Sequence, residues 1–194
     1  MLKLSVLVPT VPSRILTTYP ALLQSLLEQV NGRTDVEVLG FFDNKQRPVG
    51  DKRNDLLGLS RGEYVVFVDD DDRVGDDYVS SILDALYENP EVDCVVFDSL
   101  VTYLSEGNKQ VHCKYSIHYD YRSEGNMWWG KPAHTMVYKA SIAKAHIFKP
   151  WDEDIDWVAR ACKDINTEVH IDKILYFYDY DAESSETSKR TSGV

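Results

Sequence analysis

The sequence lacks the features that mark several common protein classes. It has three cysteines in 194 residues, Cys94, Cys113 and Cys162, and their spacing matches no metal-binding motif. No stretch approaches the roughly 18 apolar residues needed to cross a bilayer. The opening segment 1–9 is too short and ends too abruptly for a secretory signal. We therefore expect reduced thiols, no membrane span and a cytoplasmic protein.

Positive charge is also scarce. Lys and Arg number 21 against 32 Asp and Glu, which gives a net charge of -11. Such a chain repels polyanions unless its basic residues are gathered in one place, so duplex nucleic acid is a disfavoured partner. Neither the glycine-rich dinucleotide motif nor the P-loop motif occurs, which weakens both of those nucleotide-binding interpretations.

What is present indicates one α/β domain. Hydrophobic residues make up 43% of the chain, and its length suits a single core. Apolar residues recur at helical spacing over 19–30, between β-type runs at 4–8 and 36–42. A second helix is predicted at about 52–59 and a third strand at 64–68. This alternation predicts parallel strands joined by right-handed crossovers.

The second half of the chain predicts a mixed sheet with shorter, polar-interrupted β segments. Helices are expected near 76–88, 141–145 and 155–166, strands at 93–97 and 171–178, a hairpin around Glu106-Gly107-Asn108 and an aromatic loop at 126–132. The composition of 183–194 is polar, so we expect one domain over 1–182 followed by a flexible tail.

Four consecutive carboxylates, Asp69 to Asp72, follow the apolar run 64–68. In extended backbone Asp69 and Asp71 would project to one face, and Asp70 and Asp72 to the other. Neighbouring carboxylates disfavour each other's ionised form, and the usual remedy is a cation or a ring of hydrogen-bond donors. An oxygen-ligated divalent metal is therefore the candidate ligand, and a solvated acidic loop is the ordinary alternative.

Two further strand ends carry polar groups. Ligands in open α/β sheets bind beyond the carboxyl ends of parallel strands. Pro9, Thr10 and Arg14 follow the first strand, and Asp43 follows the second. Together with the aspartates, they suit a nucleotide diphosphate whose charge is neutralised by metal. Arg14 and Arg53 are candidate clamps on the diphosphate, although pairing with surface acids is an equal alternative.

These motifs, in this order along nearly the whole chain, resemble those of family 2 glycosyltransferases with the GT-A fold. Val8-Pro9-Thr10 is similar to the family's opening "VPTYN" segment, and Lys52-Arg53-Asn54 with Gly62-Glu63-Tyr64 to its "ARNxG...GEY" passage. Val68 to Asp72 resembles "LDSDD", which aligns Asp69 and Asp71 with the ends of the DxD motif. The segment 148–157 resembles the region of the "ED" pair, and 173–178 the "pLYYYR" strand, with Asp179 in place of the arginine.

The resemblance implies a GT-A fold, a mixed and mostly parallel central sheet flanked by helices. It also implies a metal-dependent, inverting transferase that moves a sugar from a UDP- or GDP-linked donor to a hydroxyl acceptor, a glycan or small molecule, with Mn²⁺ or Mg²⁺. In the family pattern Asp71 coordinates metal, Asp69 lies in the ribose or metal environment, and Asp43 contacts the base. Asp154 matches the general base, with Glu153 adjacent. The nucleotide-sugar site would comprise Pro9, Thr10, Arg14, Asp43, Arg53, Asp69 and Asp70.

Other assignments remain open between two interpretations. Asp154 could simply favour the dipole of a helix that starts at 155. Trp128 and Trp129 could be core residues, but they also suit a platform that stacks on an acceptor or sugar. His134 lacks ligand spacing, which is typical of a structural histidine, yet it lies near the tryptophans and is the better site candidate.

Two rival functions belong to other classes. A metal-dependent nucleotidyltransferase or phosphohydrolase also places carboxylates at strand ends, but it usually carries a glycine-rich phosphate loop or scattered metal ligands. A non-catalytic sugar-binding module built on the tryptophans would not need Asp43, the aspartate run and Asp154 around one crevice.

Overall fold

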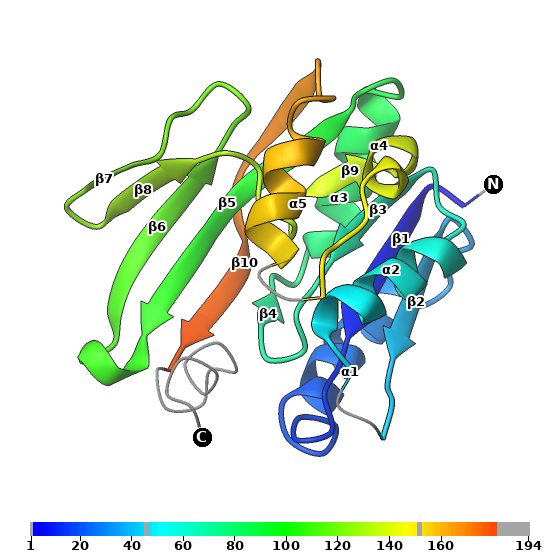
Figure 1. Ribbon diagram of the computed structural model, residues 1–194, viewed down its shortest axis with the longest axis horizontal. Coiled ribbons are helices and arrows are strands. Elements are labelled where there is room, and N and C mark those ends of the chain that lie inside the picture. Colours follow the sequence, from blue (N-terminus) through cyan, green and yellow to red (C-terminus); the bar gives the residue numbers. More distant parts are fainter. Residues whose placement is uncertain (1, 45–46, 151–152, 182–194) are drawn as a thin grey trace.

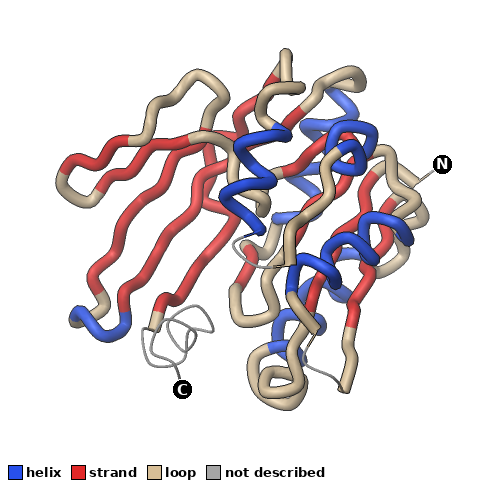
Figure 2. Tube along the Cα trace, in the orientation of Figure 1, coloured by secondary structure: helices blue, strands red, loops and turns tan. Residues whose placement is uncertain are grey.

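A computed structural model describes residues 2–44, 47–150 and 153–181 (Figures 1 and 2). They form a mixed ten-stranded sheet flanked by helices, as the GT-A fold requires. Eight strands follow the order β2-β1-β3-β9-β5-β6-β8-β7, and β10 pairs with β5 and β4. No helix in the described ranges combines the length and apolar character needed to cross a membrane.

The first half contains the predicted parallel strands. Its elements are β1 (Leu4–Pro9), α1 (Tyr19–Val30), β2 (Val36–Phe41), α2 (Val49–Leu59) and β3 (Tyr64–Phe67). Strand β1 lies between β2 and β3 and is parallel to both. All residues of β1 and β3 are buried, which explains why both read as continuous apolar runs rather than alternating ones. Their carboxyl ends therefore lie at the same edge of the sheet.

The second half is mixed, as predicted. Its elements are β4 (Arg73–Val74), α3 (Tyr78–Glu88), β5 (Cys94–Tyr103), the 3-10 turn η1 (Leu104–Glu106), β6 (Lys109–Tyr115), β7 (Arg122–Glu124), β8 (Met127–Gly130), β9 (Val137–Lys139), α4 (Ala140–Ala145), α5 (Glu153–Ala161) and β10 (Glu168–Tyr180). Strand β9 is antiparallel to both β3 and β5, whereas β10 runs parallel to β5. The hairpin between β5 and β6 is confirmed, with Gly107 and Asn108 at positive φ.

Two predicted boundaries were wrong. The aromatic segment 126–132 is not a loop, because Met127–Gly130 forms β8 and pairs with β6 and β7. The last helix stops at Ala161 rather than near residue 166. The backbone N–H groups of Asn166 and Thr167 donate to the Asp93 carboxylate, at 2.9 and 3.1 Å, and this long-range contact turns the chain into β10.

An aromatic column fixes α5 beside the end of β3. Trp157 of α5 stacks on Phe148 with ring centroids 4.6 Å apart, and Phe148 meets Phe67 edge to face at 5.4 Å. Asn54 of α2 holds the backbone of Phe148 with two hydrogen bonds, one donated by its amide at 2.9 Å and one accepted by its carbonyl at 2.8 Å. The start of α5 is therefore anchored near the carboxyl end of β3.

Two glycines provide a matched test of how closely the segment before β3 packs against β1. At Gly62 a methyl group would lie 2.6 Å from the backbone N of Ser5, whereas at Gly58, inside α2, it would meet nothing within 4 Å. We expect Gly62→Ala to lower the free energy of unfolding by about 1–3 kcal/mol, the usual cost of overpacking. Gly58→Ala should raise it by about 0.5–1 kcal/mol because alanine is the better helix former. Urea unfolding of both variants measures the difference, and equal effects would contradict the close approach of 62 to β1.

Candidate functional site

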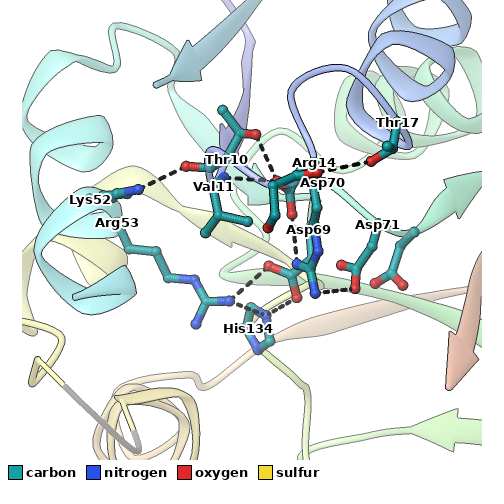
Figure 3. A network of polar contacts seen from close by, with 12 residues as sticks. Thr10, Val11, Arg14, Thr17, Lys52, Arg53, Asp69, Asp70, Asp71 and His134 are labelled. Atoms are coloured by element: carbon teal, nitrogen blue, oxygen red, sulfur yellow. Dashed lines mark hydrogen bonds and ion pairs between the residues drawn. The ribbon is translucent and has the colours of Figure 1, made fainter. Parts of the chain in front are cut away.

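The aspartate run forms a turn rather than an extended strand. The backbone N–H of Asp72 donates to the carbonyl of Asp69 at 3.1 Å, so the chain reverses directly after β3. The expected alternation, with Asp69 and Asp71 on one face, was therefore wrong. Each of the four carboxylates has different surroundings, and Figure 3 shows three of them within one polar network.

Asp70 holds the loop that follows β1. Its carboxylate is 3% exposed and accepts hydrogen bonds from Thr10 Oγ1 at 2.7 Å, the Val11 backbone N–H at 3.0 Å and Arg14 Nη1 at 2.9 Å (Figure 3). Thr10, Val11 and Arg14 therefore lie against the aspartate turn, whereas Pro9 pairs with Phe41 of β2. The Asp70 carboxylate is occupied by these donors and is the least available of the four for a ligand.

Arg14 joins two of the aspartates. Besides its bond to Asp70, its Nη2 lies 2.6 Å from Asp71 Oδ2. Arg14 is thus paired with two acids of the aspartate turn, and its role as a clamp on a diphosphate stays a prediction. Burial raises the pKa of Asp71 to about 6, and the negative charges of Asp69 and Asp70 add to this effect while Arg14 opposes it. The ionised form of Asp71 is thus under-compensated by the protein itself.

Asp69 is paired with a guanidinium and an imidazole. Its Oδ1 lies 2.8 Å from Arg53 Nη2, and its Oδ2 lies 3.2 Å from His134 Nε2. Burial raises the pKa of Asp69, but the charges of Arg53 and His134 outweigh burial and hold it well below its usual range. Arg53 and His134 are also 3.0 Å apart, so the structure joins two predicted site residues from distant segments at one carboxylate.

Asp72 is bound by a residue that the sequence reasoning missed. The hydroxyl of Tyr176 donates to Asp72 Oδ2 at 2.6 Å and accepts from the backbone N–H of Asp69 at 3.1 Å. The other oxygen, Oδ1, is buried without a hydrogen-bond partner in the described structure. Burial raises the pKa of Asp72 well above its usual value, and Asp69 and Asp71 raise it further. Alternating tyrosines at 176, 178 and 180 were the available signal.

Asp43 brings the end of β2 to the same site. Its Oδ1 forms an ion pair with Lys52 Nζ at 2.9 Å, and the same ammonium donates to the carbonyl of Thr10 at 2.8 Å. Lys52 is 1% exposed, so this charge is a fixed link between the ends of β1 and β2. Neither oxygen of Asp43 has a partner in hydrogen-bond geometry among the described residues. The three predicted strand ends thus converge.

The predicted catalytic pair lies at the first turn of α5. Asp154 Oδ1 accepts a hydrogen bond from its neighbour's backbone N–H, that of Ile155, at 2.9 Å, which is the helix-terminal role weighed as an alternative. The side chain of Glu153 lies outside the described structure. No hydrogen bond or ion pair joins Asp154 to the aspartate turn within the described ranges. The aromatic column places α5 beside the end of β3, and the catalytic role of Asp154 stays a prediction.

The two tryptophans do not form one platform. They are consecutive in β8, so their side chains point to opposite faces of the sheet. Trp128 meets Tyr115 with ring centroids 5.6 Å apart, whereas the guanidinium of Arg122 covers Trp129 at 4.3 Å. Trp128 alone remains a candidate for the face that carries Tyr115.

A divalent cation fits this site only if a bound ligand supplies part of its coordination. Among the described residues, no group of three His, Cys, Asp or Glu side chains is arranged to hold a metal ion. However, Asp71 and the unpartnered Oδ1 of Asp72 supply the carboxylate oxygens that Mn²⁺ and Mg²⁺ prefer. Mg²⁺ is usually bound by one or two carboxylates together with substrate phosphates. The donor set matches that arrangement.

A sequence profile of glycosyl transferase family 2 matches residues 40–150, more than half of the chain. The chain belongs to this family. The family membership that the resemblance implied is therefore confirmed. The matched range includes Asp43, Arg53, the aspartate turn and His134, whereas β1, Asp154 and β10 lie outside it.

Solved structures agree with the fold. The chain is similar to S. aureus TarS 1-349, with 18% identity and a TM-score of 0.62, covering 92% of this chain and 60% of that one. It is similar to S. aureus TarS 1-349 in complex with UDP-GlcNAc, with 18% identity, a TM-score of 0.62 and 93% and 59% coverage. The complex of TarS 1-349 with UDP is 19% identical, with a TM-score of 0.61, and the match covers 94% of this chain and 62% of that one. The chain thus spans about three fifths of these structures, and no curated sequence matches it significantly.

The high pKa of Asp71 makes a testable contribution to stability. Its folded pKa of about 6 exceeds the model-peptide value of 3.8, so between these pH values the folded state holds a proton that the unfolded chain releases. This group's contribution to stability therefore falls as pH rises through that window and stays low above it. We expect the gain in unfolding free energy from Asp71→Asn to be larger at pH 7.5 than at pH 4, measured by urea unfolding with chelator present. A gain that is the same at both pH values would contradict the shifted pKa.

Proposed function

We propose that this glycosyltransferase is metal-dependent and inverting, and transfers a sugar from a nucleoside diphosphate donor to a hydroxyl acceptor. The observation that carries the proposal is the uncompensated charge at the aspartate turn. Burial keeps the pKa values of Asp71 and Asp72 high, and one Asp72 oxygen has no hydrogen-bond partner in the described structure. A bound dication would balance this charge, and a donor diphosphate would complete its ligands.

The cation would be Mn²⁺ or Mg²⁺, held by Asp71 with Asp72 or Asp69 nearby, and it would offset the charge that develops on the leaving diphosphate. Arg14 lies 2.6 Å from the Asp71 carboxylate, so its guanidinium is within reach of a diphosphate bound there. Arg53 keeps Asp69 ionised and oriented through their contact at 2.8 Å. Both arginines suit diphosphate binding because guanidinium groups match phosphate oxygens in two-point contacts.

Asp43 is the candidate contact for the base or ribose. Its Oδ1 is ion-paired with Lys52 at 2.9 Å, whereas its Oδ2 is buried without a partner in hydrogen-bond geometry in the described structure. A nucleoside N–H or O–H group would supply that donor. A nucleotide-linked donor is also supported by the similar TarS 1-349, which has been crystallised in complexes with UDP-GlcNAc and with UDP.

Asp154 is the candidate general base, with Glu153 as the adjacent alternative. It lies in the first turn of α5, and the N-terminal end of a helix attracts negatively charged groups. Proton removal from the acceptor hydroxyl is worth roughly 10²–10⁴-fold in rate. A single base opposite the departing diphosphate implies inversion at the anomeric carbon.

Loss of Asp71 should abolish cation-dependent donor binding. We expect Asp71→Ala to show no shift in Tm with UDP and Mn²⁺, because the carboxylate that would share the cation with the diphosphate is gone. The matched control is Asp77→Ala, which removes an exposed aspartate that pairs with Lys173 at 2.7 Å. The control should retain the shift of the unaltered protein. Equal shifts in all three proteins would refute the metal assignment.

Loss of Asp154 should separate binding from turnover. We expect Asp154→Asn to keep the UDP-sugar Kd and to lower kcat for transfer by roughly 10²–10⁴-fold, the value of general-base catalysis. Asp156→Asn is the control in the same helix, because Asp156 pairs with Lys149 at 2.6 Å and Arg160 at 2.8 Å. A chromatographic assay of sugar transfer checks both variants. Full transfer by Asp154→Asn would reject it as the base.

A further inference from the structure

Strand β10 reaches the candidate site through the side chain of Tyr176. This tyrosine is 3% exposed, and its hydroxyl donates to Asp72 Oδ2 at 2.6 Å and accepts from the backbone N–H of Asp69 at 3.1 Å. A phenol carries a single hydrogen, and the N–H of Asp69 approaches a lone pair of the same oxygen. The hydrogen is therefore directed at the Asp72 carboxylate, and the orientation of the hydroxyl is fixed.

The two contacts of the phenol hold both ends of the aspartate turn. The backbone N–H of Asp72 donates to the carbonyl of Asp69 at 3.1 Å, so Asp70 and Asp71 are the central residues of a hydrogen-bonded turn. Tyr176 binds the first residue of this turn through its backbone and the last through its side chain. Asp71, the candidate cation ligand, lies between these two points, so the way the turn presents Asp71 depends on the phenol.

Tyr176 is itself held by strand pairing on both sides. It pairs with Val74 of β4, which is antiparallel to β10, and with Ser99 of β5, which is parallel (Figure 1). The backbone N–H of Gly75 also donates to the carbonyl of Leu175 at 3.0 Å. The segment that follows the aspartate turn is thus attached to the same strand that carries the tyrosine. A group that orients a metal ligand requires such rigid support.

Asp72 differs from the other three aspartates in the charge of its partner. Asp69, Asp70 and Asp71 each form an ion pair with an arginine, whereas the Asp72 side chain forms no ion pair among the described residues. A guanidinium would offset most of the carboxylate's charge, but a phenol is neutral and leaves that charge available to a cation. Tyr176 therefore orients Asp72 through Oδ2, while Oδ1 has no hydrogen-bond partner in the described structure.

We propose that Tyr176 is a positioning residue for the cation of the donor site, because its hydroxyl holds Asp72, and the turn that presents Asp71, in the arrangement that a divalent cation requires. This inference rests on the proposed metal dependence. It adds a residue of β10, a strand that lies outside the range matched by the family profile. Groups that hold a metal ligand from behind typically contribute about 10–100-fold to metal affinity.

The test measures Mn²⁺ binding from the electron paramagnetic resonance signal of free Mn²⁺, with UDP in one series and GDP in another. Tyr176→Phe removes only the hydroxyl, and we expect the Kd for Mn²⁺ to rise about 10–100-fold with the nucleotide that supports binding to the unaltered protein. Tyr64→Phe is the matched control. Tyr64 is also buried, lies at the opposite end of β3 from the turn, and its hydroxyl hydrogen-bonds the carbonyl oxygens of Pro90 and Val92, both at 2.9 Å. Its loss should lower Tm to a similar extent and leave the Kd for Mn²⁺ unchanged.

The outcomes separate the positioning role from the proposed function. Equal Mn²⁺ Kd values for Tyr176→Phe and the unaltered protein would overturn the role of Tyr176 and leave the metal dependence standing. An equal loss of affinity in Tyr64→Phe would also overturn it, because the loss would then follow from lower stability. Asp72→Asn keeps an oxygen that accepts from the phenol, so it should fold and bind Mn²⁺ more weakly. An unchanged Kd in that variant would reject the role even if Tyr176→Phe did not fold. Absence of Mn²⁺ binding by the unaltered protein with both nucleotides would refute the proposed metal dependence, and this inference with it.

Discussion

Mutual repulsion among four adjacent carboxylates is the constraint around which the edge of this sheet is organised. The protein relieves part of it with donors from every neighbouring segment: Arg14 after β1, Arg53 in α2, His134 before β9 and Tyr176 in β10. These donors hold the carboxylates in different directions, so relief of the repulsion also determines how the loops pack. The compensation is incomplete at Asp71 and Asp72, where burial raises the pKa of each carboxyl group.

Incomplete compensation connects stability to the proposed activity in this member of glycosyl transferase family 2. A site that neutralised all its own carboxylates would have no affinity left for a cation or for the diphosphate beside it. A site with no internal donors would repel its own loops and lose the close approach of β1, β2 and β3. Arg14 lies between these limits, because it contacts two aspartates and lies where a diphosphate would also attract it.

The parallel and antiparallel halves of the sheet carry different groups of side chains. The parallel strands β2, β1 and β3 bring Asp43, Thr10 and the aspartate turn together, at the edge where nucleotide-binding α/β proteins place their ligands. The antiparallel extension comprises β5, β6 and β8, with β10 beside β5. Tyr176 links the two halves, because it lies in β10 and binds the aspartate turn.

The sequence alone determined the strands and helices of the first half, the convergence of three strand ends and the family. These follow from hydrophobic periodicity and from short motifs whose residues are close along the chain. Only the tertiary structure decided the partners of each carboxylate, since Asp69 meets His134 and Asp72 meets Tyr176 across 65 and 104 positions. It also separated Trp128 from Trp129, because strand pairing turned an expected loop into β8. Contacts at such separations depend on sheet register, which no local pattern in one sequence encodes.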